Sequence, residues 1–190
     1  MKATVIFGSP RKNGNTASLL KPFVDELHYA GVEVDIYDVY EKNIAGCRAC
    51  LQCQKDKPRA YCVLDDDMQP ILESVAQSEL FVIACPIYCW GMPGPVKTAF
   101  DRLIYSFCKY YGDDPFGPAL LRGKRLALIT TCGYPVDKGA DLFEDTMKRG
   151  GKHCKYDYAG MLAERQRNLK EPFMDDEKEA RARAFARSLI

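Results

Sequence analysis

Apolar runs alternate with amphipathic stretches along the whole chain, and this alternation predicts strands and helices in turn. Some runs are almost continuously apolar, as expected for strands that are covered on both faces: residues 2–7, 80–85 and 126–131. Other runs alternate apolar with polar residues and predict strands with one partly covered face: residues 32–36 and 154–158. We therefore expect an α/β protein with a parallel sheet, in which the alternating segments are the edge strands.

Apolar positions spaced by three and four residues predict the helices between these strands. The first helix carries its apolar face over residues 19–27, and the second follows Asp65-Asp66-Asp67. The third begins near Pro95, the fourth ends at Gly150-Gly151, and the fifth occupies residues 175–190. With the alternating strands outside and right-handed crossovers, the strand order is 2-1-3-4-5. The pattern thus predicts one flavodoxin-like domain over residues 1–190: a doubly wound five-stranded parallel sheet with helices on both faces.

Composition removes several classes of function. The chain has 190 residues and a net charge of +1, so no overall field favours a nucleic acid partner. No apolar run is long enough to span a bilayer, and the chain opens on a strand-like segment rather than a signal sequence, so we expect no membrane partner and a cytoplasmic location. His28 and His153 are the only histidines, which argues against a three-histidine metal site. Nine cysteines, an odd number, indicate thiols or metal ligands rather than a disulfide framework.

The turn after the first strand has the features that bind a phosphate monoester. It reads Gly8-Ser9-Pro10-Arg11-Lys12-Asn13-Gly14-Asn15-Thr16 and offers helix N-terminal N–H groups, hydroxyl and amide donors, and cations. It is neither a Walker A loop, since no Lys precedes Thr16, nor a G-x-G-x-x-G fingerprint. Ligands of open α/β sheets bind beyond the carboxyl ends of the strands where strand order reverses, so we expect the site between the first and third strands.

Two further turns at the same sheet edge suit a flat ring. The turn over residues 86–95 contains the only tryptophan, Trp90, and glycines that let backbone N–H groups approach a heteroaromatic edge. The turn over residues 131–135 follows the fourth strand and is placed to close the other side. These turns are therefore candidates for the walls of a ring site.

A Cys-rich loop over residues 47–62 is the sharpest local signal. It reads Cys47-x2-Cys50-x2-Cys53, followed after eight residues by Cys62. Thiolates two residues apart can converge from a tight loop on one centre, as in ferredoxin-type ligation, and sulfur-only ligation also suits zinc. The spacing leaves an iron–sulfur cluster, a zinc ion and unmetallated thiols open.

Together these residues resemble the flavodoxin-like NAD(P)H-dependent FMN reductases and, within them, the iron–sulfur flavoproteins. The resemblance covers most of the chain and rests on the 8–16 turn, on the cysteines followed by Asp66-Asp67-Met68, and on Pro86-Ile87-Tyr88 with Lys97 and Asp101-Arg102 downstream. For the last three residues we expect a structural or subunit-contact role on a salt-bridged helix face.

The resemblance implies a set of cofactor-binding residues. The FMN phosphate would be bound by Ser9, Arg11, Asn15 and Thr16. The isoalloxazine ring would contact Pro86, Ile87, Tyr88, Cys89, Trp90 and Gly91, and its far edge Thr131, Cys132 and Gly133. The resemblance also favours a 4Fe-4S cluster as the occupant of Cys47, Cys50, Cys53 and Cys62.

The function that the resemblance implies is an NAD(P)H-dependent FMN oxidoreductase. A nicotinamide cofactor would reduce the flavin, which would reduce a small molecule or, through the cluster, a protein electron acceptor. The alternative is a non-enzymatic flavin and iron–sulfur electron carrier between partner proteins. A phosphate-ester hydrolase lacks support, because no Cys precedes Arg11 to complete a C-x5-R loop.

Two segments outside these motifs carry further expectations. Residues 105–121 are rich in aromatic side chains, which predicts the interface of a homodimer or homotetramer or a lid over the flavin, with packing on the chain's own sheet as the alternative. Arg165 and Arg167 are candidates for binding the phosphates of the nicotinamide cofactor.

Overall fold

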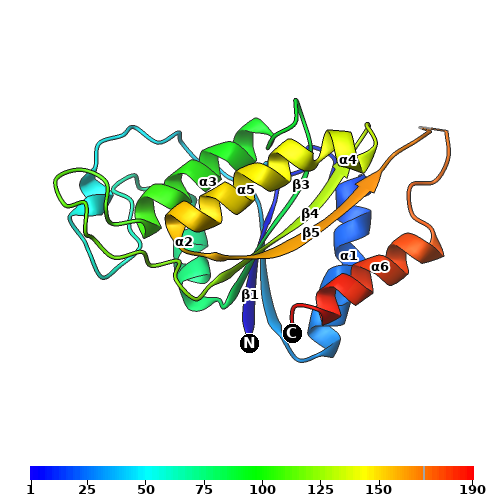
Figure 1. Cartoon of the computed structure of the whole chain (residues 1–190), viewed down its shortest axis with the longest axis horizontal. Coiled ribbons are helices and arrows are strands. Elements are labelled where there is room, and N and C mark those ends of the chain that lie inside the picture. Colours follow the sequence, from blue (N-terminus) through cyan, green and yellow to red (C-terminus); the bar gives the residue numbers. More distant parts are fainter. Residues whose placement is uncertain (169) are drawn as a thin grey trace.

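The computed structural model describes residues 1–168 and 170–190 and shows a five-stranded parallel sheet between two layers of helices (Figure 1). The strand order is β2-β1-β3-β4-β5. The strands are β1 (Lys2–Phe7), β2 (Glu33–Asp38), β3 (Leu80–Pro86), β4 (Arg125–Cys132) and β5 (Asp157–Arg165). The predicted flavodoxin-like sheet and its strand order are therefore confirmed.

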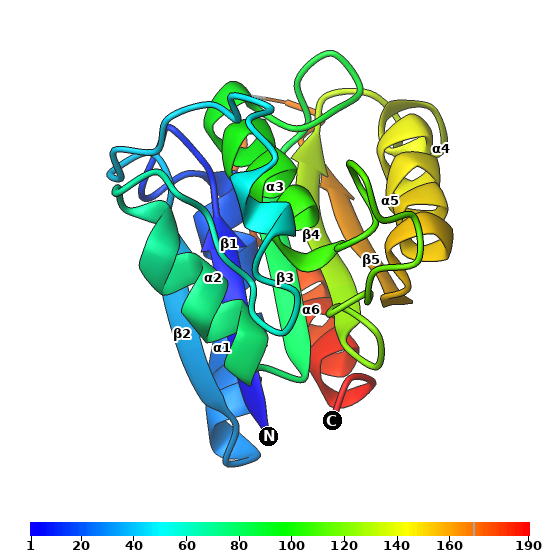
Figure 2. The same cartoon turned by 90° about the vertical axis from the view of Figure 1, so that its left-hand side faces the viewer.

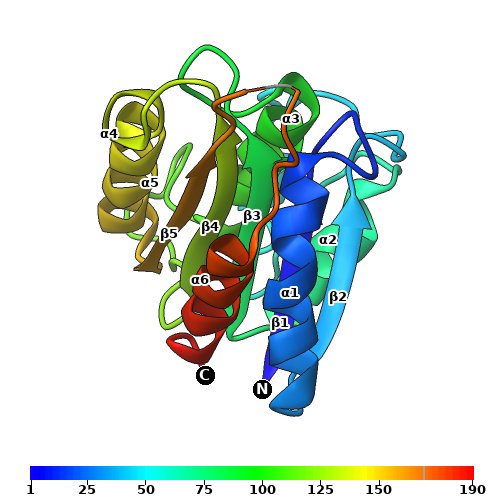
Figure 3. The ribbon, with the colours of Figure 1, turned by 90° about the vertical axis from the view of Figure 1, so that its right-hand side faces the viewer.

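The helices divide between the two faces of the sheet. One face is covered by α2 (Met68–Gln77), α3 (Gly94–Phe107) and α5 (Asp141–Cys154), as Figure 2 shows. The other face is covered by α1 (Asn15–Tyr29) and α6 (Asp176–Arg187), as Figure 3 shows. The short helices η1 (Gln52–Gln54) and α4 (Val136–Gly139) lie in connections. In the part of the chain described, none of these helices combines the length and the apolar character needed to cross a bilayer.

The central strands are buried because each has a hydrophobic core on both sides. In β3, residues 80–85 are all buried, and odd and even positions contribute to different cores. At the edge, every residue of β2 is at least partly accessible. This contrast explains why continuous apolar runs predicted the inner strands and alternating runs the outer ones.

The fifth strand and the helix before it differ from the prediction. The helix was expected to end at Gly150 and Gly151 and the strand to occupy residues 154–158, but α5 continues to Cys154 and β5 begins at Asp157. A Cβ on Gly150 would lie 2.5 Å from the hydroxyl oxygen of Tyr156, and that hydroxyl donates to the backbone oxygen of Met147 at 2.6 Å. Gly150 and Gly151 therefore do not end the helix. Their lack of a side chain leaves room for Tyr156 to pack against α5.

Candidate functional site

The turn between β1 and α1 holds the predicted phosphate-binding residues at the start of a helix. Ser9 and Thr16 are buried, Asn15 is half-buried, and Arg11 is exposed. The Ser9 hydroxyl accepts the backbone N–H of Arg11 at 3.3 Å, which closes the turn. Gly14, the N-cap of α1, has no side chain to cap the helix, and the first turn carries no acidic residue. The N–H groups and the positive end of the helix dipole therefore favour an anion here.

Gly8 fixes how closely this turn lies against α3. Its N–H donates to the backbone oxygen of Ala84 at 2.9 Å, which continues the pairing of β1 with β3. A Cβ at this position would lie 1.9 Å from Cγ2 of Val96, in the first turn of α3. Only glycine leaves the turn in this place without moving Val96.

The turn after β3 is a two-residue hairpin with unusual backbone angles. Tyr88 and Gly91 exchange backbone hydrogen bonds of 3.1 and 3.0 Å, and the central residues Cys89 and Trp90 have φ values of 50° and 60°. Positive φ at both central positions matches a type I′ turn, which normally selects Asn and Gly. Left-handed non-glycine residues cost free energy and persist where neighbouring contacts hold them, often at functional sites.

Contacts of Trp90 account for the conformation of this hairpin. Its Nε1–H donates to the backbone oxygen of Lys138 at 2.9 Å, and its ring stacks on Tyr134 with centroids 5.8 Å apart. Tyr88 and Trp90 are still 49% and 45% exposed, so part of their aromatic surface stays open at the sheet edge. The hairpin is therefore attached to the turn after β4 and presents apolar rings to solvent.

Thr131, at the end of β4, connects all the predicted turns. Its hydroxyl is 2.8 Å from the hydroxyl of Thr16, and its backbone oxygen accepts the N–H of Ile87 at 2.9 Å. The following residue, Cys132, is buried, and this burial raises the pKa of its thiol. The structure thus brings the 8–16, 86–91 and 131–133 segments together at the carboxyl ends of the strands.

Arg165 and Arg167 lie beside this edge. Arg165 donates through Nε to the backbone oxygen of Gly133 at 2.9 Å, and both arginines line a pocket of about 530 Å³ that also includes Gln166. Asn15 donates to Gln166 at 2.8 Å, which connects this pocket to the start of α1. The pocket includes carboxylates as well, so its charge is mixed.

The four cysteines of the 47–62 loop line one pocket, together with Arg102 and Tyr105 of α3. Figure 2 shows this loop, with η1 in cyan, lying in front of α3 on the outer side of the helix layer. Ala49 and Leu51 have left-handed φ values of 52° and 56°, so the backbone turns sharply on both sides of Cys50. Within the described residues, no group of three or more Cys, His, Asp or Glu side chains is arranged to hold a single metal ion. The four cysteines therefore border one pocket, but the described residues form no single-ion site.

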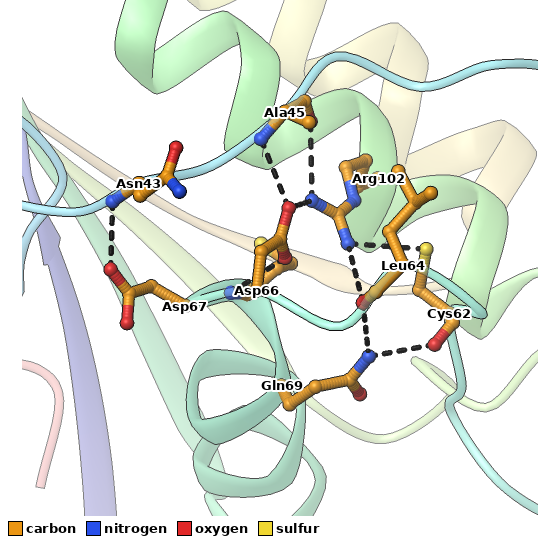
Figure 4. A network of polar contacts seen from close by, with 9 residues as sticks. Asn43, Ala45, Cys62, Leu64, Asp66, Asp67, Gln69 and Arg102 are labelled. Atoms are coloured by element: carbon orange, nitrogen blue, oxygen red, sulfur yellow. Dashed lines mark hydrogen bonds and ion pairs between the residues drawn. The ribbon is translucent and has the colours of Figure 1, made fainter.

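Arg102 has a role that the sequence did not reveal. A salt bridge on the helix face does exist between Lys97 and Asp101, at 2.5 Å, but Arg102, expected on the same face, is only 1% exposed. Its Nη1 donates to the Asp66 carboxylate at 2.5 Å and to the backbone oxygen of Ala45 at 3.1 Å. Its Nη2 lies 3.2 Å from Cys62 Sγ (Figure 4). The only advance signal was the position of Asp66, four residues after Cys62.

Asp66 is held ionised by the groups around it. Burial raises the pKa of its carboxyl, but the Arg102 guanidinium and the backbone N–H groups of Ala45 and Met68 outweigh burial, so the pKa lies below its ordinary value. Those N–H groups donate at 3.0 and 3.2 Å. The carboxylate therefore fastens the segment before the cysteines, the segment after them and α3 to one another.

The aromatic segment over residues 105–121 packs mainly on its own domain. Phe107 is buried, the Tyr110 hydroxyl donates to the backbone oxygen of His153 at 2.5 Å, and the Tyr111 hydroxyl lies 2.7 Å from His153 Nε2. The segment thus packs within the chain, as in the alternative, although these tyrosine contacts are with α5 rather than with the sheet. Phe116 is 94% exposed, and the subunit interface stays a prediction.

Comparisons with known proteins agree with this arrangement. Residues 1–141 match the family described as NADPH-dependent FMN reductase. An iron-sulfur flavoprotein of Methanosarcina thermophila is 30% identical over 139 residues, which cover 73% of this chain and 63% of that protein. One from Archaeoglobus fulgidus is 35% identical over 104 residues, which cover 55% of this chain and 46% of that protein. The chain thus spans between about half and two thirds of the length of these relatives.

Solved structures share the fold at low sequence identity. An NAD(P)H:quinone oxidoreductase from Methanothermobacter marburgensis superposes with a TM-score of 0.76 at 16% identity, covering 100% of this chain and 96% of the other. An FMN-dependent NADH-azoreductase from Bacillus anthracis, in complex with FMN, gives 0.72 at 15% identity and covers 100% and 99%. At this identity the likeness shows the flavodoxin-like fold. The sequence match over residues 1–141 shows in addition that the chain belongs to the NADPH-dependent FMN reductase family.

Proposed function

We propose that this chain binds FMN at the carboxyl edge of its sheet and works as an NAD(P)H-dependent oxidoreductase. The observation that carries the proposal is the meeting of the predicted phosphate turn and both predicted ring turns at Thr131. Bound FMN would accept hydride from a reduced nicotinamide cofactor and pass electrons on singly or in pairs. The protein's part is to bind and orient the cofactor and to shield it from water.

The phosphate would lie in the turn before α1. Ser9, Asn15 and Thr16 supply side-chain donors, Arg11 supplies an exposed cation, and the N-terminus of α1 supplies backbone N–H groups. The buried Ser9 hydroxyl belongs to a turn fixed against α3 by Gly8, so its position is set before the ligand arrives. A preformed anion site reduces the entropic cost of binding.

The ring would lie between the other two turns. On one side, we assign it to Pro86, Ile87, Tyr88, Cys89, Trp90 and Gly91. On the other side, we assign it to Thr131, Cys132 and Gly133. Flat aromatic surface from Tyr88 and Trp90 suits a heteroaromatic ring, and the contacts of Trp90 with Tyr134 and Lys138 hold the two turns against each other.

The nicotinamide donor would use Arg165 and Arg167, which line the neighbouring pocket of about 530 Å³. These cations suit the phosphates of NADH or NADPH. The electron acceptor would be a small molecule or a protein. A homodimer or homotetramer fits with the exposed ring of Phe116.

We further propose that Cys47, Cys50, Cys53 and Cys62 hold a 4Fe-4S cluster. The donor set is sulfur only, and all four cysteines line one pocket. A single zinc ion has less support, because the described thiols do not form a single-ion site. Such a cluster would supply one-electron transfer.

Fluorescence titration of the flavin-free protein with FMN tests the cofactor proposal. Replacement Ser9→Ala removes one donor to a charged phosphate, worth about 1.5–3 kcal/mol, and should weaken FMN binding by roughly tenfold or more. Ser18→Ala is the matched control: Ser18 lies in α1, outside the predicted phosphate turn, and its hydroxyl donates to the backbone oxygen of Gly14 at 3.1 Å. Equal affinity of the Ser9 variant and the unaltered protein would refute the phosphate assignment.

Steady-state turnover separates the enzyme from a non-enzymatic electron carrier. The FMN-loaded protein is mixed with NADH or NADPH and an excess of a quinone, and nicotinamide absorbance is followed. Sustained oxidation over many turnovers supports the oxidoreductase. A single stoichiometric burst, or none, would favour the carrier.

A further inference from the structure

The cysteine pocket contains a buried cation that the proposed function has not used. Arg102 lines the pocket with the four cysteines, is 1% exposed, and lies 3.2 Å from Cys62 Sγ through Nη2. Its Nε is buried and has no hydrogen-bond partner among the described residues. Buried donors without partners are rare and call for an explanation, of which a missing ligand is one. The guanidinium therefore places a buried positive charge beside the pocket, and its Nε–H is a buried donor without a partner among the described residues.

Arg102 also fastens both ends of the cysteine loop. Its guanidinium donates to the backbone oxygens of Ala45, two residues before Cys47, and Leu64, two residues after Cys62, at 3.1 and 3.5 Å (Figure 4). The planar fork of arginine suits such contacts in several directions, whereas lysine offers a single point charge. Loss of Arg102 would thus release the two ends of the loop from α3.

We propose that Arg102 is a positioning residue for Cys62 and, as the buried cation of the pocket, raises the reduction potential of the 4Fe-4S cluster held there. This inference rests on the cluster binding proposed above. Reduction of such a cluster adds one electron and one negative charge and breaks no bond. A nearby cation and hydrogen bonds to sulfur favour the more negative form, and both act strongly where water is excluded.

Asp66 gives the proposal a test of sign. Its carboxylate pairs with Arg102 at 2.5 Å, and the two side chains are 8% and 1% exposed. Arg102→Gln removes a positive charge and should lower the reduction potential. Asp66→Asn breaks the same ion pair but leaves the positive charge uncompensated, and should raise the potential. A purely structural ion pair would instead disturb the loop similarly in both variants and shift the potential in the same direction.

The experiment is an anaerobic dithionite titration of the cluster-loaded chain of 190 residues, followed by visible absorbance and by electron paramagnetic resonance. Iron and acid-labile sulfide are measured first for every variant. Arg102→Lys keeps the charge and should hold the potential closer to that of the unaltered protein than Arg102→Gln does. Lys97→Gln, which removes a cation from the exposed pair on the same helix, is the matched control and should leave the potential unchanged.

The outcomes separate the inference from the proposed function. If the unaltered protein incorporates no iron and sulfide after reconstitution, the cluster proposal fails and the role of Arg102 fails with it. If the cluster forms but Arg102→Gln and Asp66→Asn shift the potential in the same direction, or neither shifts it, only the inference is overturned. Should Arg102→Gln not fold, Asp66→Asn is measured in its place, and a downward shift of the potential, or none, overturns the inference.

Discussion

Replacement Gly8→Ala tests whether the phosphate turn owes its position to direct contact with α3. The added Cβ would lie 1.9 Å from Cγ2 of Val96, whereas carbon atoms in contact lie about 3.5–4.0 Å apart, so the groups must separate by about 1.6–2.1 Å. Val96 is fully buried and β-branched, with little rotamer freedom in a helix, and the turn is held by the Gly8 hydrogen bond to Ala84. Neither side can yield cheaply.

Overpacking of this kind costs about 1–3 kcal/mol. For a chain of 190 residues, that cost corresponds to a fall of roughly 2–12 °C in the thermal midpoint. Because the displaced residues begin the turn that we assign to the FMN phosphate, we also expect weaker FMN binding. Differential scanning calorimetry of the flavin-free protein and an FMN titration measure the two effects separately.

The double variant Gly8→Ala/Val96→Ala tests the stated cause. Truncating Val96 removes the atom that the new Cβ would meet, so the two substitutions should be non-additive and the double variant should recover part of the lost FMN affinity. Val96→Ala alone is the control for the cavity it leaves. A Gly8→Ala protein with unchanged stability, or a strictly additive double variant, would contradict the packing argument.

Other predictions concern stability. The pKa of Asp66 lies below its ordinary value of 3.8, so its pair with Arg102 stabilises the fold above that pH, and this contribution is lost as the pH falls through the lowered pKa. When the urea midpoint of unfolding is plotted against pH, Asp66→Asn should therefore show a smaller decrease at acid pH than the unaltered protein. Cys89 has φ 50°, so Cys89→Val should destabilise by about 1 kcal/mol or more relative to Cys89→Gly, in the same urea assay. Thr16→Val should cost about 1–3 kcal/mol by leaving the buried Thr131 hydroxyl unpaired, whereas Thr16→Val/Thr131→Val should cost less; a larger loss in the double variant would show that the hydroxyls do not depend on each other.

The sheet was predictable where burial acts along the chain itself. Strands β1, β3 and β4 have helices on both faces, and most of their side chains are apolar on both. Strand β5 was misplaced because residues 159–163, Ala-Gly-Met-Leu-Ala, have little β propensity and become a strand only by pairing with β4. Cys154 and Tyr156 are both buried and two residues apart, which is the spacing of one strand face, but Cys154 is the last residue of α5.

The candidate site was predictable as a set of turns but not as a set of contacts. Brändén's rule places the turns at one edge from strand order alone. It says nothing of the Thr16 and Thr131 hydroxyls, which are 115 residues apart, or of Arg102 and Cys62, which are 40 apart. Such contacts depend on the helix packing, so Arg102 looked like a neighbour of the exposed Asp101 rather than a cation of the interior.

Helix α3 connects the two proposed cofactor sites. Val96, in its first turn, meets the phosphate turn at Gly8, and Arg102 meets the cysteine pocket. Six residues of helix separate them by about 9 Å along the axis, and a packed helix keeps that separation fixed. Because contacts at this distance contribute nearly independently, we expect Gly8→Ala to change FMN affinity without moving the cluster potential, and Arg102→Gln to do the reverse. If both variants instead changed both the FMN affinity and the cluster potential to the same extent, α3 would move as a unit, and its position would couple the two sites.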